Sequence, residues 1–306
     1  MLSLHEKKNS FNPSADIYLG VCAYNEEKNI GLLLENLTTS QNLPATCNVL
    51  IVCSGCTDST PRIVEQFQKL NSHIKLITEA ERGGKARALN NIFSRASQSE
   101  MLILTNADAV PVPGSIMMLT EALRDKTIGA VSGRPVPLSS SPSLSSKVVR
   151  IIWELHHEIS IRESVKLSGE LCVIRPFLVK RIPTNLATDE PYIEMLIRRQ
   201  GYRIGYVPEA VVGIRCPEKL REVFKHRRRI WAGHLQIKQM AGFAVSTSDF
   251  RKILPTLVKS LRLHKGELHA LALLVLIDSF AYLLARRDVS IGKVPFVWEM
   301  LKSTKT

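Results

Sequence analysis

The chain has 306 residues, with 41 Lys and Arg against 28 Asp and Glu, and therefore a formal net charge of +13. This length is ample for one large α/β core with a C-terminal extension, and the six cysteines, with a single Cys-x-x-Cys pair, indicate free thiols in a reducing compartment rather than a zinc site. The excess charge is local, because residues 215 to 265 hold 13 Lys and Arg against 3 Asp and Glu, and this region contains no helix-turn-helix, RNP or zinc signature that would favour nucleic acid as the partner.

Four apolar segments in the first 110 residues each run into a polar loop. The pattern predicts strands at 17–22, 48–53, 74–78 and 101–104, and helices at about 27–37, 61–70 and 85–96. Strands that alternate with ten-residue helices form βαβ units, which give a mostly parallel sheet with right-handed crossovers. All four loops then open on the carboxyl edge of the sheet, where open α/β folds bind ligands.

The side chains expected at that edge suit a nucleotide diphosphate and a metal ion. Glu26, Asp58, Arg82, Lys85 and Asp108 follow the four predicted strands. Asp108 comes directly after the fourth strand, and its carboxylate, with an amide two positions earlier, supplies the hard oxygen ligands that Mg²⁺ or Mn²⁺ prefers. The simpler interpretation is that Asp108 only caps the next turn.

Eight short motifs follow one another along the chain: Ala23-Tyr-Asn-Glu-Glu27, Gly55-Cys-Thr-Asp-Ser-Thr60, Arg82-Gly-Gly-Lys-Ala-Arg-Ala-Leu-Asn90, Asn106-Ala-Asp108, Gly169-Glu170, Thr188-Asp-Glu190, Pro208-Glu-Ala210 and His226-Arg-Arg-Arg-Ile-Trp231. In these motifs and their order, the chain resembles the family 2 glycosyltransferases of the GT-A fold over about residues 15 to 240.

The resemblance implies a donor site for a nucleotide-diphosphate sugar. It places Tyr24, Asn25 and Glu26 at the nucleoside pocket, Asp58 after the second strand, and Lys85 near the diphosphate. The chain departs from the family pattern at two places. At the first, Cys53 and Ser54 stand where the family has aspartates that contact the nucleobase, so the base is not identified.

The second departure concerns the metal motif. Asn106 replaces the first aspartate of the family's Asp-x-Asp motif, so one charged ligand becomes a neutral carbonyl while Asp108 keeps the last carboxylate. The resemblance therefore implies a Mg²⁺ or Mn²⁺ site of reduced metal affinity.

The resemblance also implies the catalytic and acceptor residues. Glu190 matches the catalytic base, with Asp189 as the alternative, and one base with direct attack implies inversion at the anomeric carbon. Residues matched to the acceptor side are Gly169, Glu170, Arg228, Arg229 and Trp231. The alternative is that the two acids only stabilise the N-terminus of a helix over about 191–200, which Thr188 would cap.

An apolar stretch at 268–285 follows the basic region and contains His269 and Asp278. At 1.5 Å per residue it reaches about 27 Å, which is slightly less than a hydrocarbon core of roughly 30 Å. We expect an amphipathic or re-entrant helix at an anionic membrane surface, with a single span or a soluble core helix as alternatives. The chain start has no apolar signal core, so we expect the catalytic domain in the cytoplasm.

The expected organisation is a tail at 1–14, a nucleotide-sugar-binding half at 15–135, an acceptor-side half at 136–240 and a helical membrane-proximal region at 241–306. The Pro and Ser residues of 135–146 predict a mobile loop between the two halves. The predicted function is transfer of a sugar to a hydroxyl of a lipid-linked or polysaccharide acceptor. A sugar nucleotidyltransferase and an inactive membrane-bound scaffold of the same fold are the alternatives.

Overall fold

Eight strands form one mixed sheet within the residues that the computed structural model describes, which are 16–44, 46–139, 141–162, 165–246, 256, 265–297, 299 and 302–305. The predicted N-terminal tail and all of the basic residues between 251 and 264 lie outside these ranges. The strand order is β3-β2-β1-β4-β7-β6-β8-β5. The strands are β1 (Ile17–Ala23), β2 (Asn48–Ser54), β3 (Ile74–Glu79), β4 (Met101–Asn106), β5 (Ala109–Pro111), β6 (Ile128–Pro137), β7 (Leu171–Ile174) and β8 (Arg203–Ile214).

The first four strands confirm the predicted parallel arrangement. β1 pairs in parallel with β2 and β4, and β2 pairs in parallel with β3. The second half of the sheet mixes directions, because β7 runs antiparallel to both β4 and β6, whereas β6 and β8 are parallel. The carboxyl ends of β1, β2, β3 and β4 therefore meet at one edge, as the sequence predicts.

The helices alternate with the strands in the first half and are longer in the second half. They are α1 (Ile30–Thr39), α2 (Thr60–Leu70), α3 (Lys85–Ala96), α4 (Ser115–Ala122), α5 (Leu144–Ile161), α6 (Glu190–Arg199), α7 (Leu220–Ala241) and α9 (Leu268–Ser290), with short 3₁₀ turns η1 (Pro176–Leu178), η3 (Lys265–Glu267) and η4 (Lys302–Lys305). The first helix begins three residues later than predicted, because the Glu26 carbonyl accepts hydrogen bonds from the amides of Asn29 and Ile30 in the preceding turn.

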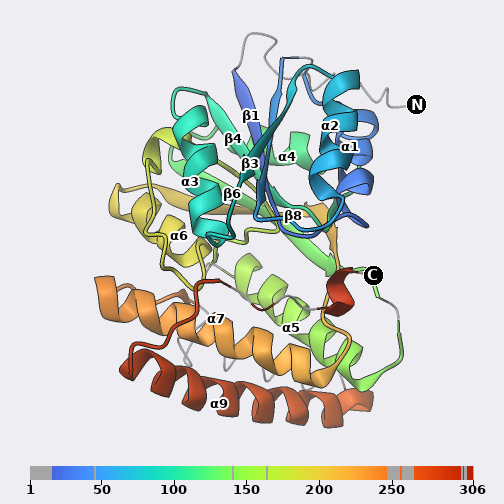
Figure 1. The fold of residues 1–306 in the computed structure, drawn as a ribbon. Helices are drawn as coiled ribbons and strands as arrows, with labels where there is room; N and C mark the ends of the chain where they lie inside the picture. The colour runs from blue at the N-terminus through green and yellow to red at the C-terminus, as the bar shows by residue number, and fades with distance from the viewer. Residues whose placement is uncertain are drawn as a thin grey trace, which may run out of the picture.

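Two apolar layers cover the sheet, one on each face (Figure 1). Side chains alternate along β2, so Val49 and Ile51 pack with α1, α2 and α4, whereas Leu50 and Val52 pack with α3 and α6. Burial of both faces explains why these strands read as nearly continuous apolar runs. This mixed α/β sheet with flanking helices and a helical C-terminal region confirms the predicted fold class.

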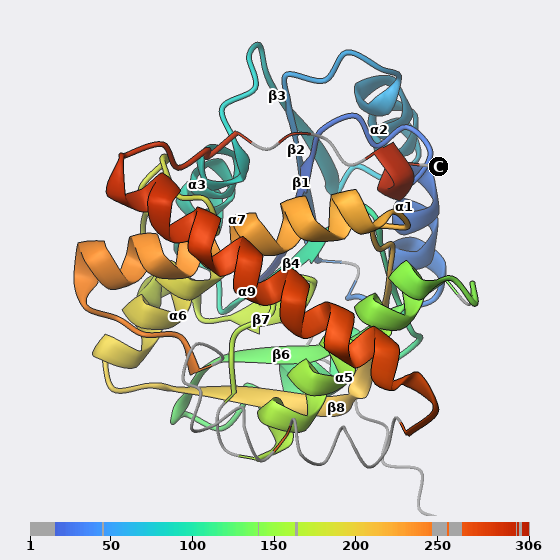
Figure 2. The ribbon, with the colours of Figure 1, turned by 90° about the horizontal axis from the view of Figure 1, so that it is seen from below.

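A third layer, made of α5, α7 and α9, lies beyond the carboxyl edge of the sheet (Figures 1 and 2). Its apolar core joins Val148 and Ile151 of α5, Val223 of α7, and Leu271 and Leu274 of α9. α9 packs along α7 and forms the outermost helix of the molecule. The helical layer therefore closes the side of the molecule where the four polar loops open.

The predicted mobile loop at 135–146 is wrong in part. Residues up to Pro137 belong to β6, and α5 begins at Leu144, after Ser143 accepts a hydrogen bond from the amide of Ser146 as an N-cap. The predicted boundary at residue 135 therefore falls inside a strand, and the two predicted halves share a single sheet.

Two ion pairs fasten α9 to α7. Arg227 contacts Asp278 through Nε–Oδ1 and Nη2–Oδ2 distances of 2.6 and 2.9 Å, and Arg228 contacts Asp288 through distances of 2.7 and 2.6 Å. Both are bidentate pairs, whose fixed geometry makes them stronger than single hydrogen bonds. Asp278, the charged residue inside the apolar stretch, is thus compensated within the protein.

Candidate active site

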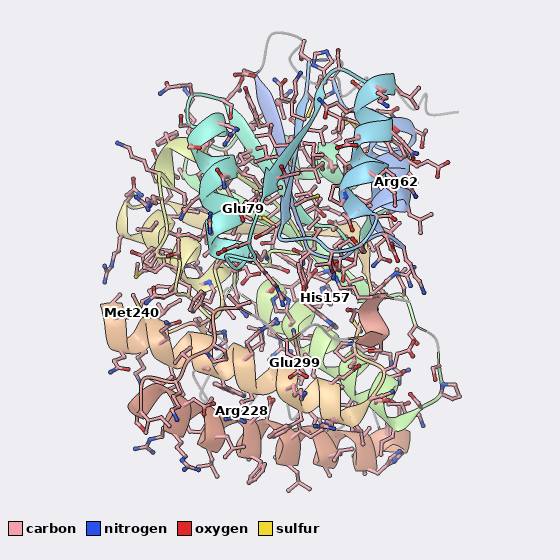
Figure 3. The ribbon with its side chains drawn as sticks, in the orientation of Figure 1. Arg62, Glu79, His157, Arg228, Met240 and Glu299 are labelled. Carbon is pink, nitrogen blue, oxygen red and sulfur yellow. The ribbon has the colours of Figure 1, made fainter. Side chains whose placement is uncertain are left out.

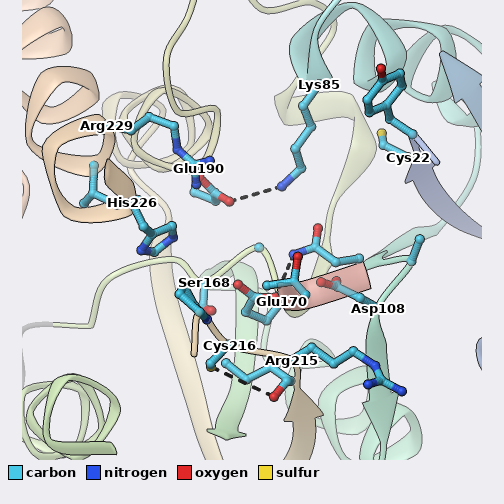
Figure 4. Close-up of a pocket in the computed structure, with 18 of the residues that line it drawn as sticks. Cys22, Lys85, Asp108, Ser168, Glu170, Glu190, Arg215, Cys216, His226 and Arg229 are labelled. Atoms are coloured by element: carbon cyan, nitrogen blue, oxygen red, sulfur yellow. Dashed lines mark hydrogen bonds and ion pairs between the residues drawn. The ribbon is translucent and has the colours of Figure 1, made fainter. Parts of the chain in front are cut away.

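A cavity of about 320 Å³ lies between the carboxyl edge of the sheet and the helical layer. This volume is within the range typical of small-molecule sites. Its walls include the last residue of β2, the loops after β1, β3 and β4, the loop before β7, the start of α6, and helices α5 and α7. Figure 4 shows how acidic and basic side chains from these elements face one another in the cavity.

The loops after β1 and β3 form the donor end of the cavity. Tyr24 and Glu26 line it, and the Arg82 guanidinium lies 3.7 Å from the centroid of the Tyr24 ring. This cation–π contact fixes an aromatic face beside a positive charge. Lys85 extends into the same space from the first turn of α3, after Gly84 adopts a φ of 82° that a residue with a side chain rarely takes.

Asn25 and Asp58 were predicted in the donor site, but neither lines the cavity. Asn25, at a φ of 52°, joins the loop after β1 to the loop after β2. It accepts a hydrogen bond from the Thr57 amide at 2.9 Å and donates one to the Thr57 hydroxyl at 3.0 Å. Asp58 accepts from the Glu27 amide at 3.1 Å and from the Thr60 hydroxyl at 2.6 Å. The structure therefore gives both residues a supporting position behind Tyr24 and Glu26.

The residues after β2 differ from the family pattern, and the structure shows what occupies that place. Ser54 lines the cavity, and its hydroxyl donates a hydrogen bond of 2.5 Å to Glu79 at the end of β3. Glu79 is buried and also accepts from Asn91 at 2.6 Å; Figure 3 labels its position. Sequence reasoning missed Glu79, although its place at the end of a strand, like that of Asp108, was an available signal.

The C-terminal segment covers the donor end of the cavity. Lys305 forms an ion pair with Glu26, and the Thr304 carbonyl accepts a hydrogen bond of 3.2 Å from Asn29. Phe296 and Glu299 also line the cavity, and Glu299 pairs with Lys225 of α7 at 2.7 Å. Burial lowers the pKa of Lys305 to about 8. Nothing local in the sequence connects residue 305 with residue 26, so sequence reasoning missed this contact.

The acidic residues at the end of β4 form the candidate metal site. Asp108 and Glu170 both line the cavity, and Asn106 donates a hydrogen bond of 2.7 Å from its amide nitrogen to Glu170. Burial, together with the nearby Asp108 charge, raises the pKa of Glu170 to about 7, and burial also raises the pKa of Asp108. Two carboxylates that repel each other in a partly buried site, beside an amide oxygen, suit a hard divalent cation.

This set of donors is small. Among the described residues, no three side chains of His, Cys, Asp or Glu gather closely enough to hold a metal by themselves. A cation at Asp108 would therefore need further oxygen ligands from a bound molecule, and a diphosphate supplies such oxygens.

Lys85 connects the donor end to the two candidate catalytic acids. Its ammonium lies 3.2 Å from Oε1 of Glu190 and 3.3 Å from Oδ2 of Asp189 (Figure 4). Burial acts against its charge, but the two carboxylates outweigh it and raise the pKa of Lys85 well above the usual value. The structure thus brings Lys85 into contact with two acids that lie about 100 positions later in the sequence.

The two acids differ in environment. Burial and the neighbouring Glu190 raise the pKa of Asp189 to about 6, and its side chain is only 5% exposed. Burial also acts against the charge of Glu190, but Lys85 outweighs burial and lowers the pKa of Glu190. Glu190 lines the cavity and Asp189 does not, so Glu190 is the acid that a substrate there would meet.

The start of α6 departs from the predicted capping arrangement. The helix begins at Glu190, its N-cap residue is Asp189, and no side chain caps it. The Thr188 hydroxyl is buried without a hydrogen-bond partner among the described residues. The two acids are therefore held at the cavity by their position at the helix start and by Lys85.

Gly169 is placed against Glu190 for a steric reason. A Cβ atom at residue 169 would lie 2.4 Å from Oε1 and 2.8 Å from Cγ of Glu190, which is closer than atoms can pack. Both Gly169 and Glu170 line the cavity, and their assignment to the acceptor stays a prediction. The glycine thus leaves room for the Glu190 carboxylate.

The side chains of the basic motif on α7 point in two directions, toward the cavity and toward α9. His226, Arg229 and Ile230 line the cavity, whereas Arg228 is turned toward Asp288 and Trp231 packs edge-on against Tyr282 and His234. Of the three α7 residues predicted at the acceptor side, the structure therefore places only Arg229 in the cavity. The helical period explains the division, because residues 226, 229 and 230 share one face of α7.

Sequence reasoning missed several other cavity residues, notably Trp153 and His156 of α5, Lys166 and Arg215. They lie outside the eight sequence motifs, and they reach the cavity through long-range packing of α5 and of the loop before β7. No local pattern in the sequence marks them.

A family model described as "Glycosyltransferase like family 2" matches residues 13–233. Poly-beta-1,6-N-acetyl-D-glucosamine synthases from Staphylococcus aureus (strain COL) and Staphylococcus epidermidis are 25% and 24% identical over 225 residues, which cover 70% of this chain and 53% of each relative. The chain therefore spans about half the length of these curated relatives.

Solved structures show the same fold. The mannosyltransferase PcManGT from Pyrobaculum calidifontis, in complex with GDP-Man and Mn²⁺, has a TM-score of 0.57 at 23% identity, covering 92% of this chain and 76% of that one. S. aureus TarS 1–349, in complex with UDP-GlcNAc, has a TM-score of 0.50 at 16% identity, covering 91% and 92%. These likenesses confirm the predicted GT-A-like fold.

Proposed function

The chain belongs to the glycosyltransferase-like family 2, and from this membership and the cavity geometry we propose that it transfers a sugar from a nucleotide-diphosphate sugar to an acceptor hydroxyl, with inversion. The observation that carries the proposal is the arrangement of Lys85 between Glu190, Asp189 and the acidic end of β4. This arrangement supports a single cavity in which Glu190 serves as base, Lys85 binds phosphate and Asp108 binds the metal.

The donor binds at the end formed by the loops after β1 and β3. Tyr24 and Arg82 offer a flat aromatic face and a guanidinium, and Glu26 and Asn106 offer polar contacts, with Asn25 and Asp58 joining the loop after β1 to the loop after β2. The related structures in complex with GDP-Man and with UDP-GlcNAc support a nucleotide-diphosphate sugar as the donor. The base and the sugar are left open.

Asp108, with Glu170 and the Asn106 carbonyl, would hold a Mg²⁺ or Mn²⁺ ion against the diphosphate. When bound, such an ion neutralises charge that develops on the leaving diphosphate. The Mn²⁺ in the PcManGT complex supports this assignment.

Lys85 links donor binding to the activity of the base. Its ammonium forms ion pairs with Glu190 and Asp189. A diphosphate entering the cavity competes for this ammonium, and Glu190 then keeps its negative charge without its cation. Loss of the cation makes the carboxylate a better proton acceptor.

Glu190 deprotonates the acceptor hydroxyl as its oxygen attacks the anomeric carbon. The new carbon–oxygen bond forms on the face opposite the diphosphate, the bond to the diphosphate breaks, and the proton goes to Glu190. One displacement gives inversion. Asp189 is the alternative base, but its burial behind Glu190 supports a role in positioning Lys85.

We further propose that α9 holds the enzyme at an anionic membrane surface with its catalytic domain in the cytoplasm. α9 is the one helix among the described residues that is long and apolar enough to cross a membrane, and a third of its apolar window is buried in the protein. Its outer face exposes Leu268, Val275, Leu276, Phe280 and Leu283.

A helix held on one side can bury only its other side in lipid. Arg227 and Arg228 hold α9 on α7, so the geometry supports a helix that lies in the membrane interface rather than one that spans the bilayer. Exposed Arg286 and Arg287 at its end can contact anionic headgroups. Free cysteines throughout the chain fit the reducing cytoplasm.

The proposed activity is tested by incubating the purified protein with a panel of UDP-, GDP- and dTDP-sugars and Mn²⁺, and measuring release of the nucleoside diphosphate. Slow release from one donor class is the expected result, because water can replace the acceptor. No release from any donor, with or without membrane extract as acceptor source, would contradict the proposal.

A further inference from the structure

The acceptor side of the cavity contains a group of basic side chains that the donor site does not use. Lys166, from the loop before β7, lies there with His156 of α5 and with His226 and Arg229 of α7; we call these four residues the cationic cluster. Figure 4 shows His226 and Arg229 entering the cavity from α7, beside Glu190. The cluster is therefore next to the proposed base.

Lys166 has no hydrogen bond or ion pair with any described residue, although it faces the cavity from a partly buried position. The protein fixes it there, because the Leu167 amide donates to Glu194 at 2.9 Å and the Ser168 amide donates to Ser132 at 2.9 Å. Glu194 is itself buried and paired with Arg198 at 2.8 Å. An ammonium held in a cavity without a partner is costly unless a ligand supplies the opposite charge.

The two imidazoles of the cluster, His156 and His226, are surrounded by positively charged groups. Burial, with Lys166 and neighbouring basic groups, lowers the pKa of His156 to about 3 and that of His226 well below its usual value. Nδ1 of His156 is buried and has no hydrogen-bond partner within the described part of the chain. Both rings are therefore neutral and can donate or accept a hydrogen bond to a ligand.

Asp278 binds the adjacent Arg227 in a bidentate pair. Arg229 lines the cavity, and burial lowers its pKa to about 10 despite the nearby carboxylates Glu190 and Asp189. A guanidinium, an ammonium and two imidazoles in one partly buried place match the oxygens of a phosphate group.

An apolar wall continues from the cationic cluster. Val149, Ile152 and Trp153 of α5 and Val223 of α7 line the cavity, and Val149 and Val223 belong to the apolar core shared with α9. A ligand that carries a phosphate next to an apolar group would bury both parts here.

We propose that the acceptor is a phosphate-bearing amphiphile, whose phosphate binds the cationic cluster, whose apolar part packs on α5 and α7, and whose hydroxyl faces Glu190. This inference rests on the proposed glycosyl transfer and names the chemistry of its acceptor. The phosphate serves only for binding: the hydroxyl oxygen forms the bond to the anomeric carbon, its proton goes to Glu190, and the nucleoside diphosphate leaves.

Three small molecules distinguish the contribution of the phosphate to binding from that of the apolar chains. Dihexanoyl phosphatidate carries a phosphate monoester and short apolar chains, glycerol 3-phosphate carries the phosphate alone, and dihexanoyl phosphatidylcholine carries the chains without a phosphate monoester. Their dissociation constants are measured by calorimetry below the micelle concentration of the lipids. We expect phosphatidate to bind at least about tenfold more tightly than either of the other two.

The test uses variants on each side of the cavity. Lys166→Met, with Arg229→Met as a second variant in case the first is misfolded, should weaken phosphatidate binding about 10- to 100-fold, as expected for hydrogen bonds to charged groups. Lys126→Met, an exposed lysine at the other end of the sheet, is the matched control and should leave binding unchanged. Lys85→Met should keep phosphatidate binding and lose nucleoside-diphosphate binding.

Each outcome decides a different statement. Equal binding of glycerol 3-phosphate and phosphatidate, both dependent on Lys166, would support the phosphate site and assign it a soluble acceptor. Phosphatidate binding that survives both Lys166→Met and Arg229→Met, or that is lost only in Lys85→Met, would overturn the proposal. Failure of nucleoside diphosphates to bind the wild-type protein would instead contradict the proposed donor, whatever the phosphatidate result.

Discussion

The donor and acceptor ends of the cavity are built in different ways. The donor end comes from consecutive βα units, and its loops support one another through contacts such as Asn25 to Thr57 and Glu27 to Asp58. The acceptor end combines α5, the loop before β7, and α7, which the chain supplies from residues far apart. The difference indicates a donor site specified by local sequence and an acceptor site specified by tertiary packing, so changes at the two ends should have separable effects.

The largest expected effect is on the base, where the two ends meet. Glu190→Gln should lower the transfer rate by about 10²–10⁴-fold, because the acceptor proton loses its receiver. Donor binding should be preserved, since the substitution leaves Lys85 free to bind the diphosphate. Single-turnover rates and donor affinity are measured in the same preparation. Full activity in Glu190→Gln together with loss in Asp189→Asn would assign the role of base to Asp189.

A smaller but still large effect is expected at the donor end. Asp108→Asn should reduce transfer about 10²-fold, because the site loses its charged ligand for the cation, while the melting temperature stays within a few degrees. Glu65→Gln, at an exposed carboxylate on α2, is the control and should change neither quantity. Transfer that continues unchanged in excess EDTA would show that the metal assignment is wrong.

The helical layer should affect location without affecting the donor site. The double substitution Leu276→Ser and Phe280→Ser should reduce flotation with anionic liposomes by at least about tenfold, because both side chains are exposed apolar groups on α9. Leu70→Ser removes an apolar side chain that is 87% exposed on α2, far from α9 in the fold, and should float like the wild type. Wild-type protein that fails to float even at low salt would contradict membrane binding.

The contact between α9 and α7 should contribute to stability. Asp278→Asn leaves Arg227 without its charged partner, and both side chains are less than a third exposed, so the free energy of unfolding should fall by about 1–3 kcal/mol. Glu121→Gln breaks the exposed pair with Arg124 and should change it by less than about 1 kcal/mol. Denaturant titrations compare the two. Equal effects would mean that the inter-helix pair adds nothing beyond a surface contact.

The smallest expected effect is a pH dependence of stability at the metal end. The pKa of Glu170 is about 7 in the folded protein and near 4.5 when unfolded, so between these values the folded state binds more protons and stability falls as pH rises. Asp189, with a pKa of about 6, acts in the same direction at lower pH. In metal-free protein, Glu170→Gln should therefore remove a decrease of a few degrees in melting temperature between pH 6 and 7. An unchanged slope would show that Glu170 does not titrate there.

The limits of sequence reasoning follow the same division of the molecule. The four parallel strands and the positions of Lys85 and Asp108 could be predicted, because apolar runs ending in polar loops are local patterns. Glu190 follows no such run, and its assignment came from the resemblance of Thr188-Asp-Glu190 to a family motif. β6, β7 and β8 could not, since their pairing joins residues such as Ala130 and Ile174 that are distant in the chain. The direction of Arg228, and the contact of Lys305 with Glu26, also depend on how α9 and the C-terminal segment pack.

The central claim is a metal-assisted donor site for a nucleotide-diphosphate sugar at the carboxyl edge of the sheet. It is tested most directly by calorimetric titration of the metal-free protein with UDP, GDP and dTDP, each with and without Mn²⁺. The account predicts that at least one nucleoside diphosphate binds, that Mn²⁺ strengthens its binding, and that Asp108→Asn removes the Mn²⁺ effect. Absence of binding for all three, or binding that neither Mn²⁺ nor Asp108→Asn changes, would contradict it.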